Sequence, residues 1–200
     1  MESENKTGRL LIKQAVFIPL IYFGMIILAG IFAVDYSHTG QHASELGINE
    51  SRVAVVFFKA GIIMTGFSLF VLAFGLFTVF KKRLIMTALF LIFFGITFIF
   101  GAVFPIGSPW HGLYGAGLSV MLIPFIFLYE AKNMLDSEAV RIVSVIAGLL
   151  MFIYLWSMVA GLDPVSKRGL TQRLFGCVVF GWVSFISYHL SSCFLSENRR

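Results

Sequence analysis

The chain has 200 residues, of which 58% are hydrophobic and only 12% are charged, and its mean hydropathy is +0.92. Soluble domains carry about 25% charged residues, so a water-soluble fold could not hide so much apolar surface. The net charge of +5 does not indicate a nucleic-acid-binding protein, because the basic residues are dispersed rather than gathered in one patch with exposed aromatic side chains. We therefore expect a membrane protein with no nucleic-acid partner.

Six apolar stretches account for most of the chain. A hydrocarbon core about 30 Å thick needs roughly 20 apolar residues in a helix. The sequence predicts membrane spans at 14–34, 53–80, 84–104, 112–130, 139–160 and 172–194. Because the connections are short, we expect an all-α polytopic membrane protein in which residues 1–200 form a single bundle of six transmembrane helices.

Basic residues are more frequent on one side of this predicted bundle. Cytoplasmic loops of membrane proteins carry an excess of Lys and Arg, so the more basic side indicates the cytoplasm. With the N-terminus inside, the inner side holds Lys6, Arg9, Lys13, Lys81, Lys82, Arg83, Lys132, Arg141, Arg199 and Arg200, and the outer side holds Arg52, Lys167, Arg168 and Arg173. This distribution predicts a multi-pass protein of the cell (inner or plasma) membrane with both termini in the cytoplasm.

Small residues recur at four-residue spacing within the predicted spans. Gly61 and Thr65 form one such pair, and Cys177 and Gly181 form another. Small side chains at this spacing allow two helix backbones to approach closely. We expect these positions to be helix-packing sites.

The loop after the first span is rich in ionisable groups. His38 and His42 are four residues apart, which on a helix would place both imidazoles on one face, as a metal site requires. Glu45 or Asp35 could supply a third ligand, but solvated histidines are the more common outcome in a polar loop. No metal and no other cofactor is therefore predicted. The Ser-Glu-Leu-Gly segment that contains Glu45 can alternatively form a short helix that its glycine ends.

The turn between the third and fourth predicted spans contains Pro105 and Pro109, which fix its backbone. Trp110 follows and suits the headgroup zone of a membrane. We place His111 at the start of the fourth helix, where unpaired backbone N–H groups oppose protonation of the imidazole. A neutral imidazole there could act as an acid or base, a metal ligand or a hydrogen-bond partner. The alternative is an interfacial histidine with no chemical role.

The last outer loop ends with Thr171, a candidate N-cap, and with Arg173 in the first turn of the sixth helix. A cation is electrostatically misplaced in that turn. Arg173 therefore requires an anionic partner, which could be Glu45, Asp35, Asp163, or a phosphate or carboxylate on a ligand. Because buried charges tend to pair, we expect a structural ion pair.

Lys59 lies about two turns into the second predicted span. Its long stem can lift the ammonium group to the outer interface. Alternatively it lines a pocket, because Gly66 shares its helix face and would let another helix come close. In that case Lys59 would belong to a polar cluster at the outer end of the bundle.

Three outer motifs carry a resemblance to a known family: Ser44-Glu45-Leu46-Gly47, Phe104-Pro105 followed by Gly107 and His111, and Gly169-Leu170-Thr171-Gln172-Arg173. Over essentially its whole length the chain resembles a six-helix prokaryotic membrane family of unknown function, domain-of-unknown-function family nine-nine-eight. More distantly, it is similar to the Frag1/DRAM/Sfk1 membrane proteins. The resemblance implies the six-helix architecture and singles out Glu45, His111 and Arg173. It implies no activity, and His38 and His42 lie outside its motifs.

These observations predict a pocket at the outer end that recognises a polar or anionic lipid headgroup or a small ligand. Arg173, Lys59 and Asp35 would bind it, and His111 and Glu45 would be an acid/base pair if chemistry follows. The alternatives are a membrane-embedded hydrolase that uses His111 and Glu45, a non-catalytic sensor or assembly protein, and a small transporter. Common catalytic motifs are absent from the sequence, so whether the protein is an enzyme stays open. Membrane lipids are the expected partners, and the oligomeric state is not predicted.

Overall fold

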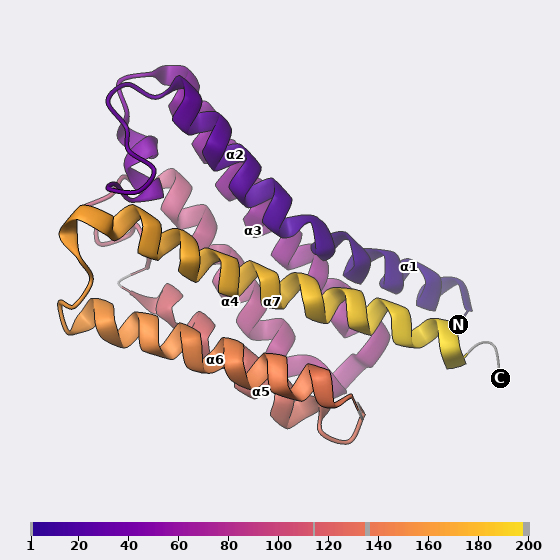
Figure 1. Ribbon diagram of the computed structural model, residues 1–200. Helices are drawn as coiled ribbons and strands as arrows, with labels where there is room; N and C mark the ends of the chain where they lie inside the picture. Colours follow the sequence, from indigo (N-terminus) through magenta and orange to yellow (C-terminus); the bar gives the residue numbers. More distant parts are fainter. Residues whose placement is uncertain (1, 114, 135–136, 198–200) are drawn as a thin grey trace.

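The computed structural model describes residues 2–113, 115–134 and 137–197, with the backbone alone given for 2–5 and 193–197. Every regular element in these residues is helical, as predicted (Figure 1). The α-helices are α1 (Glu2–Lys13), α2 (Ile18–Phe32), α3 (Arg52–Phe80), α4 (Ile85–Val103), α5 (Ile123–Ala131), α6 (Glu138–Val159) and α7 (Arg168–Glu197). Short 3-10 helices lie between them: η1 (Gln14–Phe17), η2 (Ala43–Ile48), η3 (Lys81–Leu84), η4 (Ala116–Leu122) and η5 (Val165–Lys167).

The helices run back and forth in six passes. α1, η1 and α2 make the first pass, α3 and α4 the next two, η4 with α5 the fourth, and α6 and α7 the last two (Figure 1). α1 begins and α7 ends at the same end of the bundle, which also holds η3 and the α5–α6 turn. The loop with η2 and the α6–α7 connection lie at the other end, which we call the outer end. Arg199 and Arg200, assigned to the inner side, lie outside the described residues.

The helices are apolar along their length. Within the described residues, four helices are long and apolar enough to cross a membrane: Lys6–Phe32, Arg52–Val103, Glu138–Val159 and Val165–Ser192. The second of these contains both α3 and α4, which turn back on each other at η3 and so supply two passes (Figure 1). Large apolar side chains such as Leu20, Phe74 and Ile153 are more than 60% exposed, as lipid-facing positions in a membrane protein are.

The fourth pass differs from the predicted helix over 112–130. Residues 116–122 form the 3-10 helix η4, and the α-helix begins only at Ile123, beside Pro124. Proline has no backbone N–H and is tolerated only in the first turn of an α-helix, so it favours a helix start here rather than a continuous helix. With about 2.0 Å per residue in η4 and 1.5 Å in α5, this pass reaches about 27 Å, close to the roughly 30 Å hydrocarbon core.

Glycines let neighbouring passes approach closely. Gly66 of α3 and Gly95 of α4 face each other, and a Cβ on either would lie 2.9 or 2.8 Å from the other's carbonyl oxygen. Gly61 packs against Met25 of α2 in the same way, as its spacing with Thr65 predicts. Gly181, in contrast, is exposed and its missing Cβ would meet open space, so the expected packing at Gly181 is not found.

A carboxylate from one pass caps the helix of another. Glu130, near the end of α5, accepts hydrogen bonds from the backbone N–H groups of Met86 and Thr87, both at 2.9 Å, and from the Thr87 hydroxyl at 2.7 Å. These N–H groups belong to the first turn of α4, where they have no partner within the helix. Glu130 therefore ties the short α5 to the α3–α4 hairpin.

Candidate binding cavity

A cavity of about 270 Å³ lies near the outer end of the bundle, among α2, α3, α4, α7, η2 and η4. Its walls are largely apolar, and no Asp, Glu, Lys or Arg is among the described residues that line it. They are Tyr22, Ala43, Ser44, Phe58, Ile62, Phe94, Thr97, Phe98, Gly101, His111, Gly112, Gly117, Leu118, Val120, Gln172, Phe175, Gly176, Val179 and Phe180. The predicted outer pocket therefore has a structural counterpart, but one without charged walls.

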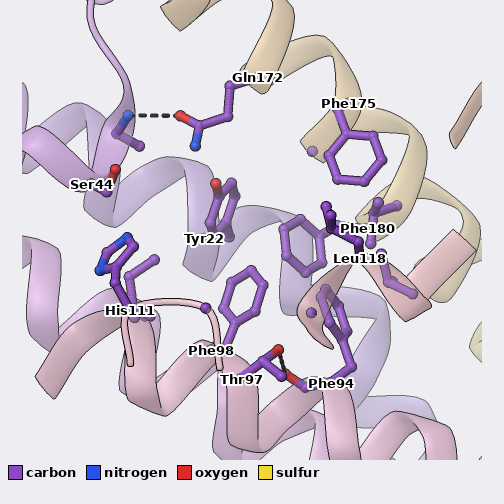
Figure 2. Close-up of a pocket in the computed structure, with 18 of the residues that line it drawn as sticks. Tyr22, Ser44, Phe94, Thr97, Phe98, His111, Leu118, Gln172, Phe175 and Phe180 are labelled. Carbon is purple, nitrogen blue, oxygen red and sulfur yellow. Dashed lines mark hydrogen bonds between the residues drawn. The ribbon is translucent and has the colours of Figure 1, made fainter. Parts of the chain in front are cut away.

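Aromatic rings form one side of the cavity (Figure 2). The ring centroids of Tyr22 and Phe180 are 4.5 Å apart, those of Phe94 and Phe98 4.8 Å, and those of Phe98 and Phe180 5.5 Å. The rings are tilted or edge-on to one another, the arrangement that aromatic quadrupoles favour. Because each ring packs on its neighbours, this wall keeps a defined shape.

Polar groups gather at the other side. Figure 2 shows Ser44, His111, Gln172 and the hydroxyl of Tyr22 grouped away from Phe94, Phe175 and Phe180. The Gln172 side-chain carbonyl accepts a hydrogen bond from the Ala43 N–H at 2.7 Å, which orients the amide and leaves its NH₂ group available. The cavity thus has one polar and one aromatic side.

The Tyr22 hydroxyl has no hydrogen-bond partner among the described residues, although the side chain is only 6% exposed. Polar groups in protein interiors usually have a hydrogen-bond partner, so this hydroxyl is available to water or a ligand. The hydroxyl opens into the cavity. Sequence reasoning missed Tyr22, because a tyrosine in an apolar span carries no pattern that marks it.

His111 lies in a turn rather than in the first turn of a helix, so its predicted place at the start of the fourth helix is wrong. Its Nδ1 is 2.8 Å from the carbonyl oxygen of Phe104. A carbonyl can only accept, so Nδ1 carries the hydrogen, and in the neutral ring Nε2 is left as an acceptor. His111 is the one residue of the predicted site that lines the cavity.

The irregular fourth pass makes room for this cavity. Gly115 is the N-cap that precedes η4, with φ of +82°, a left-handed conformation that glycine adopts without steric cost. Gly117 lies against α4, where a Cβ would be 3.2 Å from the Thr97 hydroxyl. The glycines and the 3-10 turn therefore leave space where a regular helix would place side chains. Leu118 lines part of the resulting cavity.

Arg173 lies outside the cavity wall, at the centre of a network of neutral acceptors that we call the Arg173 cluster. Its guanidinium donates to the carbonyl oxygens of Gly169 at 2.7 Å and Gln41 at 3.2 Å, to the Tyr36 hydroxyl, and to His38 Nδ1 at 3.2 Å. The expected ion pair is not formed: in the described part of the chain Arg173 has no carboxylate partner. α7 begins at Arg168, so Arg173 also lies beyond the first helical turn.

The expected carboxylate partners have other roles. Glu45 accepts from the His42 N–H at 2.8 Å and from the Gln41 amide at 3.1 Å, so it stabilises the start of η2. Asp163 accepts from the hydroxyl of Thr171 at 2.7 Å, and Thr171 lies within α7 rather than at its N-cap. The alternative of a short helix around Glu45 is confirmed as η2, which ends one residue after Gly47.

The loop of residues 33–51 is held against α7 and covers the cavity. Besides the Arg173 cluster, the N–H of Leu170 donates to the Thr39 carbonyl at 3.0 Å. Gly169 lets the two backbones touch, because a Cβ there would lie 2.6 Å from the carbonyl oxygen of His38. Ala43 and Ser44 of this loop line the cavity, and Ala43 bonds to Gln172. Residues 169–173, one of the three motifs, therefore fasten the loop over the site.

The remaining predicted site residues lie elsewhere. Lys59 is half-buried in α3, does not line the cavity, and forms no hydrogen bond or ion pair with the described residues. Asp35 is exposed in the turn after α2. His38 and His42 lie in a turn and before η2, not on one helix face, and the described residues hold no group of three His, Cys, Asp or Glu placed to bind a metal ion.

The Arg173 cluster changes the titration of its members. Burial and the Arg173 charge together lower the pKa of His38 below its usual value of 6.5. Burial raises the pKa of the Tyr36 hydroxyl, and the adjacent guanidinium opposes that rise. Since arginine can only donate, His38 accepts at Nδ1 when neutral, and protonation there would remove the acceptor and add a second cation.

The stability of the fold should therefore depend on His38 below neutral pH. With a folded pKa lower than the unfolded one, the unfolded chain binds more protons, so stability is lost as the pH falls from about 6.5 through the folded pKa. We expect the unfolding temperature in detergent to drop between about pH 7 and pH 5, and His38→Gln to remove part of that drop. His42→Gln serves as the control, and an equal effect of both variants would contradict the assignment to His38.

The described architecture is that of a helical bundle with apolar passes and an uncharged internal cavity, an arrangement typical of integral membrane proteins. The chain belongs to the family described as "Protein of unknown function (DUF998)", whose model matches residues 16–189. This range begins in η1 and ends within α7, so it includes the cavity and the Arg173 cluster. The chain matches no curated protein and no solved structure.

Proposed function

We propose that this protein is a multi-pass protein of the cell membrane, with both termini in the cytoplasm, that binds the head of a lipid-like amphiphile in the outer cavity. The observation that carries the proposal is the Tyr22 hydroxyl, which belongs to a buried side chain, has no hydrogen-bond partner among the described residues and opens into the polar side of an aromatic cavity. Apolar walls with a few convergent polar groups are typical of small-molecule sites. The loop fastened by Arg173 would close the cavity from the outside.

The structure supports binding better than catalysis. His111 lines the cavity, but Glu45, its expected acid/base partner, is occupied by the N–H of His42 and the amide of Gln41. A hydrolase also needs an activated nucleophile; the Ser44 hydroxyl lines the cavity with His111, but no hydrogen bond joins these two side chains in the described structure. The sequence predicted Arg173, Lys59 and Asp35 as direct ligand contacts, but they do not line the cavity. We assign the direct contacts to Tyr22, Gln172 and His111 instead.

Filling the cavity tests this proposal. We expect Leu118→Trp to lower the amount of co-purified amphiphile, measured by native mass spectrometry in mild detergent, by about tenfold or more. The reason is that overpacking costs about 1–3 kcal/mol and tenfold corresponds to about 1.4 kcal/mol. Leu122→Trp is the matched control, because Leu122 belongs to the same 3-10 helix but is 42% exposed. Equal retention by the two variants and the wild type would contradict the proposal.

A further inference from the structure

The chemistry of the cavity restricts the charge of its ligand. No ionisable acid, lysine or arginine is among the described residues that line it, and the Arg173 guanidinium is occupied by four neutral acceptors. Lys59 does not line the cavity. An ionised phosphate or carboxylate would lose its hydration there without an opposite charge to compensate for it, which is strongly unfavourable. The buried head of the ligand is therefore uncharged.

The polar side specifies which hydrogen bonds this head makes. The Tyr22 hydroxyl and the Gln172 NH₂ are free donors, since the Gln172 carbonyl is already bonded to Ala43. His111 offers an acceptor at Nε2, because its Nδ1 hydrogen is bonded to Phe104. A complementary head has a carbonyl oxygen toward Tyr22 and Gln172, with a further oxygen substituent within reach of His111.

The shape of the cavity favours a flat head. Tyr22, Phe94, Phe98 and Phe180 present tilted or edge-on rings along one side, and a flat aromatic or quinonoid ring packs favourably on such rings. Its volume of about 270 Å³ lies just below the range of about 300–1,000 Å³ for drug-sized ligands. One substituted ring fits in that space, whereas the head and two ester groups of a phospholipid do not.

From these three constraints, and resting on the proposed function, we infer that the ligand is an uncharged lipid whose head is a single oxygen-substituted ring, of the quinone type. The ring lies against Phe98 and Phe180, and a ring carbonyl accepts hydrogen bonds from Tyr22 and Gln172. The apolar tail remains outside this polar end. The Arg173 cluster acts on the ligand only by holding the covering loop in place.

Binding of defined probes to the purified full-length protein in detergent tests this inference. Equilibrium dialysis would compare a decyl-substituted benzoquinone with dioctanoylglycerol, which is uncharged but not flat, and with dioctanoyl phosphatidylglycerol, which is anionic. We expect saturable binding of the quinone only, and its loss in Leu118→Trp but not in Leu122→Trp. Binding of either glycerolipid in preference to the quinone, abolished by Leu118→Trp, would overturn the ligand class and leave the proposed function standing. If the binding of no probe depended on Leu118, and if both tryptophan variants co-purified equal amounts of amphiphile, the ligand class and the proposed function would both be contradicted.

Tyr22→Phe tests the polar contact separately. It keeps the ring and deletes only an unpartnered hydroxyl, so the ligand-free protein should be as stable as the wild type or more so. Quinone affinity should fall about five- to tenfold, as expected for loss of one hydrogen bond of about 1–1.4 kcal/mol. Tyr188→Phe, at an exposed position of α7, is the matched control. Unchanged quinone affinity in Tyr22→Phe would overturn the proposed orientation of the head.

Discussion

Replacing Arg173 with alanine is expected to lower the free energy of unfolding by about 2–3 kcal/mol, because hydrogen bonds from a charged donor contribute about 1.5–3 kcal/mol and their partners are left unpaired. Arg173 alone joins the Tyr36 hydroxyl, His38 Nδ1 and the Gln41 carbonyl to α7. Arg173→Lys should recover only part of the loss, since a single ammonium cannot reproduce the planar fork of the guanidinium. Unfolding in detergent measures both variants.

Two controls separate the loss of the Arg173 cluster from a general loss of charge. Arg168→Ala removes an arginine five residues earlier in α7, where the side chain is exposed. Hydrogen exchange should also accelerate in residues 33–51 of the Arg173→Ala variant and remain unchanged in the α5–α6 turn at the other end of the bundle. If Arg168→Ala were equally destabilising, or if hydrogen exchange rose uniformly, Arg173 would not be the residue that holds the loop of residues 33–51 against α7.

Replacing Glu130 with alanine should cost about 2–3 kcal/mol, the second large effect. The substitution leaves the N–H groups of Met86 and Thr87 and the Thr87 hydroxyl without an acceptor in a part of the bundle where Thr87 is buried. Loss of a helix cap costs about 0.5–2 kcal/mol, and bonds to a charged acceptor cost more. Glu130→Gln should be less severe, because its amide retains one accepting oxygen. Thermal or chemical unfolding in detergent provides the measurement.

Glu138→Ala is the matched control for Glu130. Glu138 also lies in the first turn of a helix, α6, but it is exposed, and Ser137 already caps that helix. A carboxylate in such a position contributes about 0.3–1 kcal/mol through the helix dipole. In a double-mutant cycle, Thr87→Val should lose much of its effect once Glu130 is absent. Additive effects of the two substitutions would show that the bond between the Thr87 hydroxyl and Glu130 contributes nothing.

The apolar runs of the sequence predict the passes of the bundle. A long apolar segment that is removed from water must satisfy its backbone polar groups internally, and a helix does so. The fourth pass departs from prediction because hydropathy does not register the missing N–H of Pro124, whereas the helix must accommodate it. Gly61 was identified correctly because four-residue spacing reports a helix face. Gly181 was not, because spacing cannot show whether that face meets another helix or open space.

The candidate site was only partly predictable. Charge and motif position identified Arg173 and His111, but the partners of Arg173 are backbone carbonyls, a phenol and an imidazole, which no sequence spacing identifies. Tyr22 and Gln172 were missed because their importance arises from what surrounds them after folding. Glu130 was missed for a related reason: its partners are the unpaired N–H groups of a helix 43 or 44 residues away in sequence.

The 3-10 form of η4 connects the cavity to the length of the fourth pass. Its residues rise about 2.0 Å each, against 1.5 Å in an α-helix, so conversion of η4 to α-helix would shorten this pass by about 3–4 Å. The same conversion would turn Gly117, Leu118 and Val120 to new directions and remove the cavity wall that they form. The extended 3-10 form of η4 therefore gives the fourth pass both its length and its part of the cavity wall.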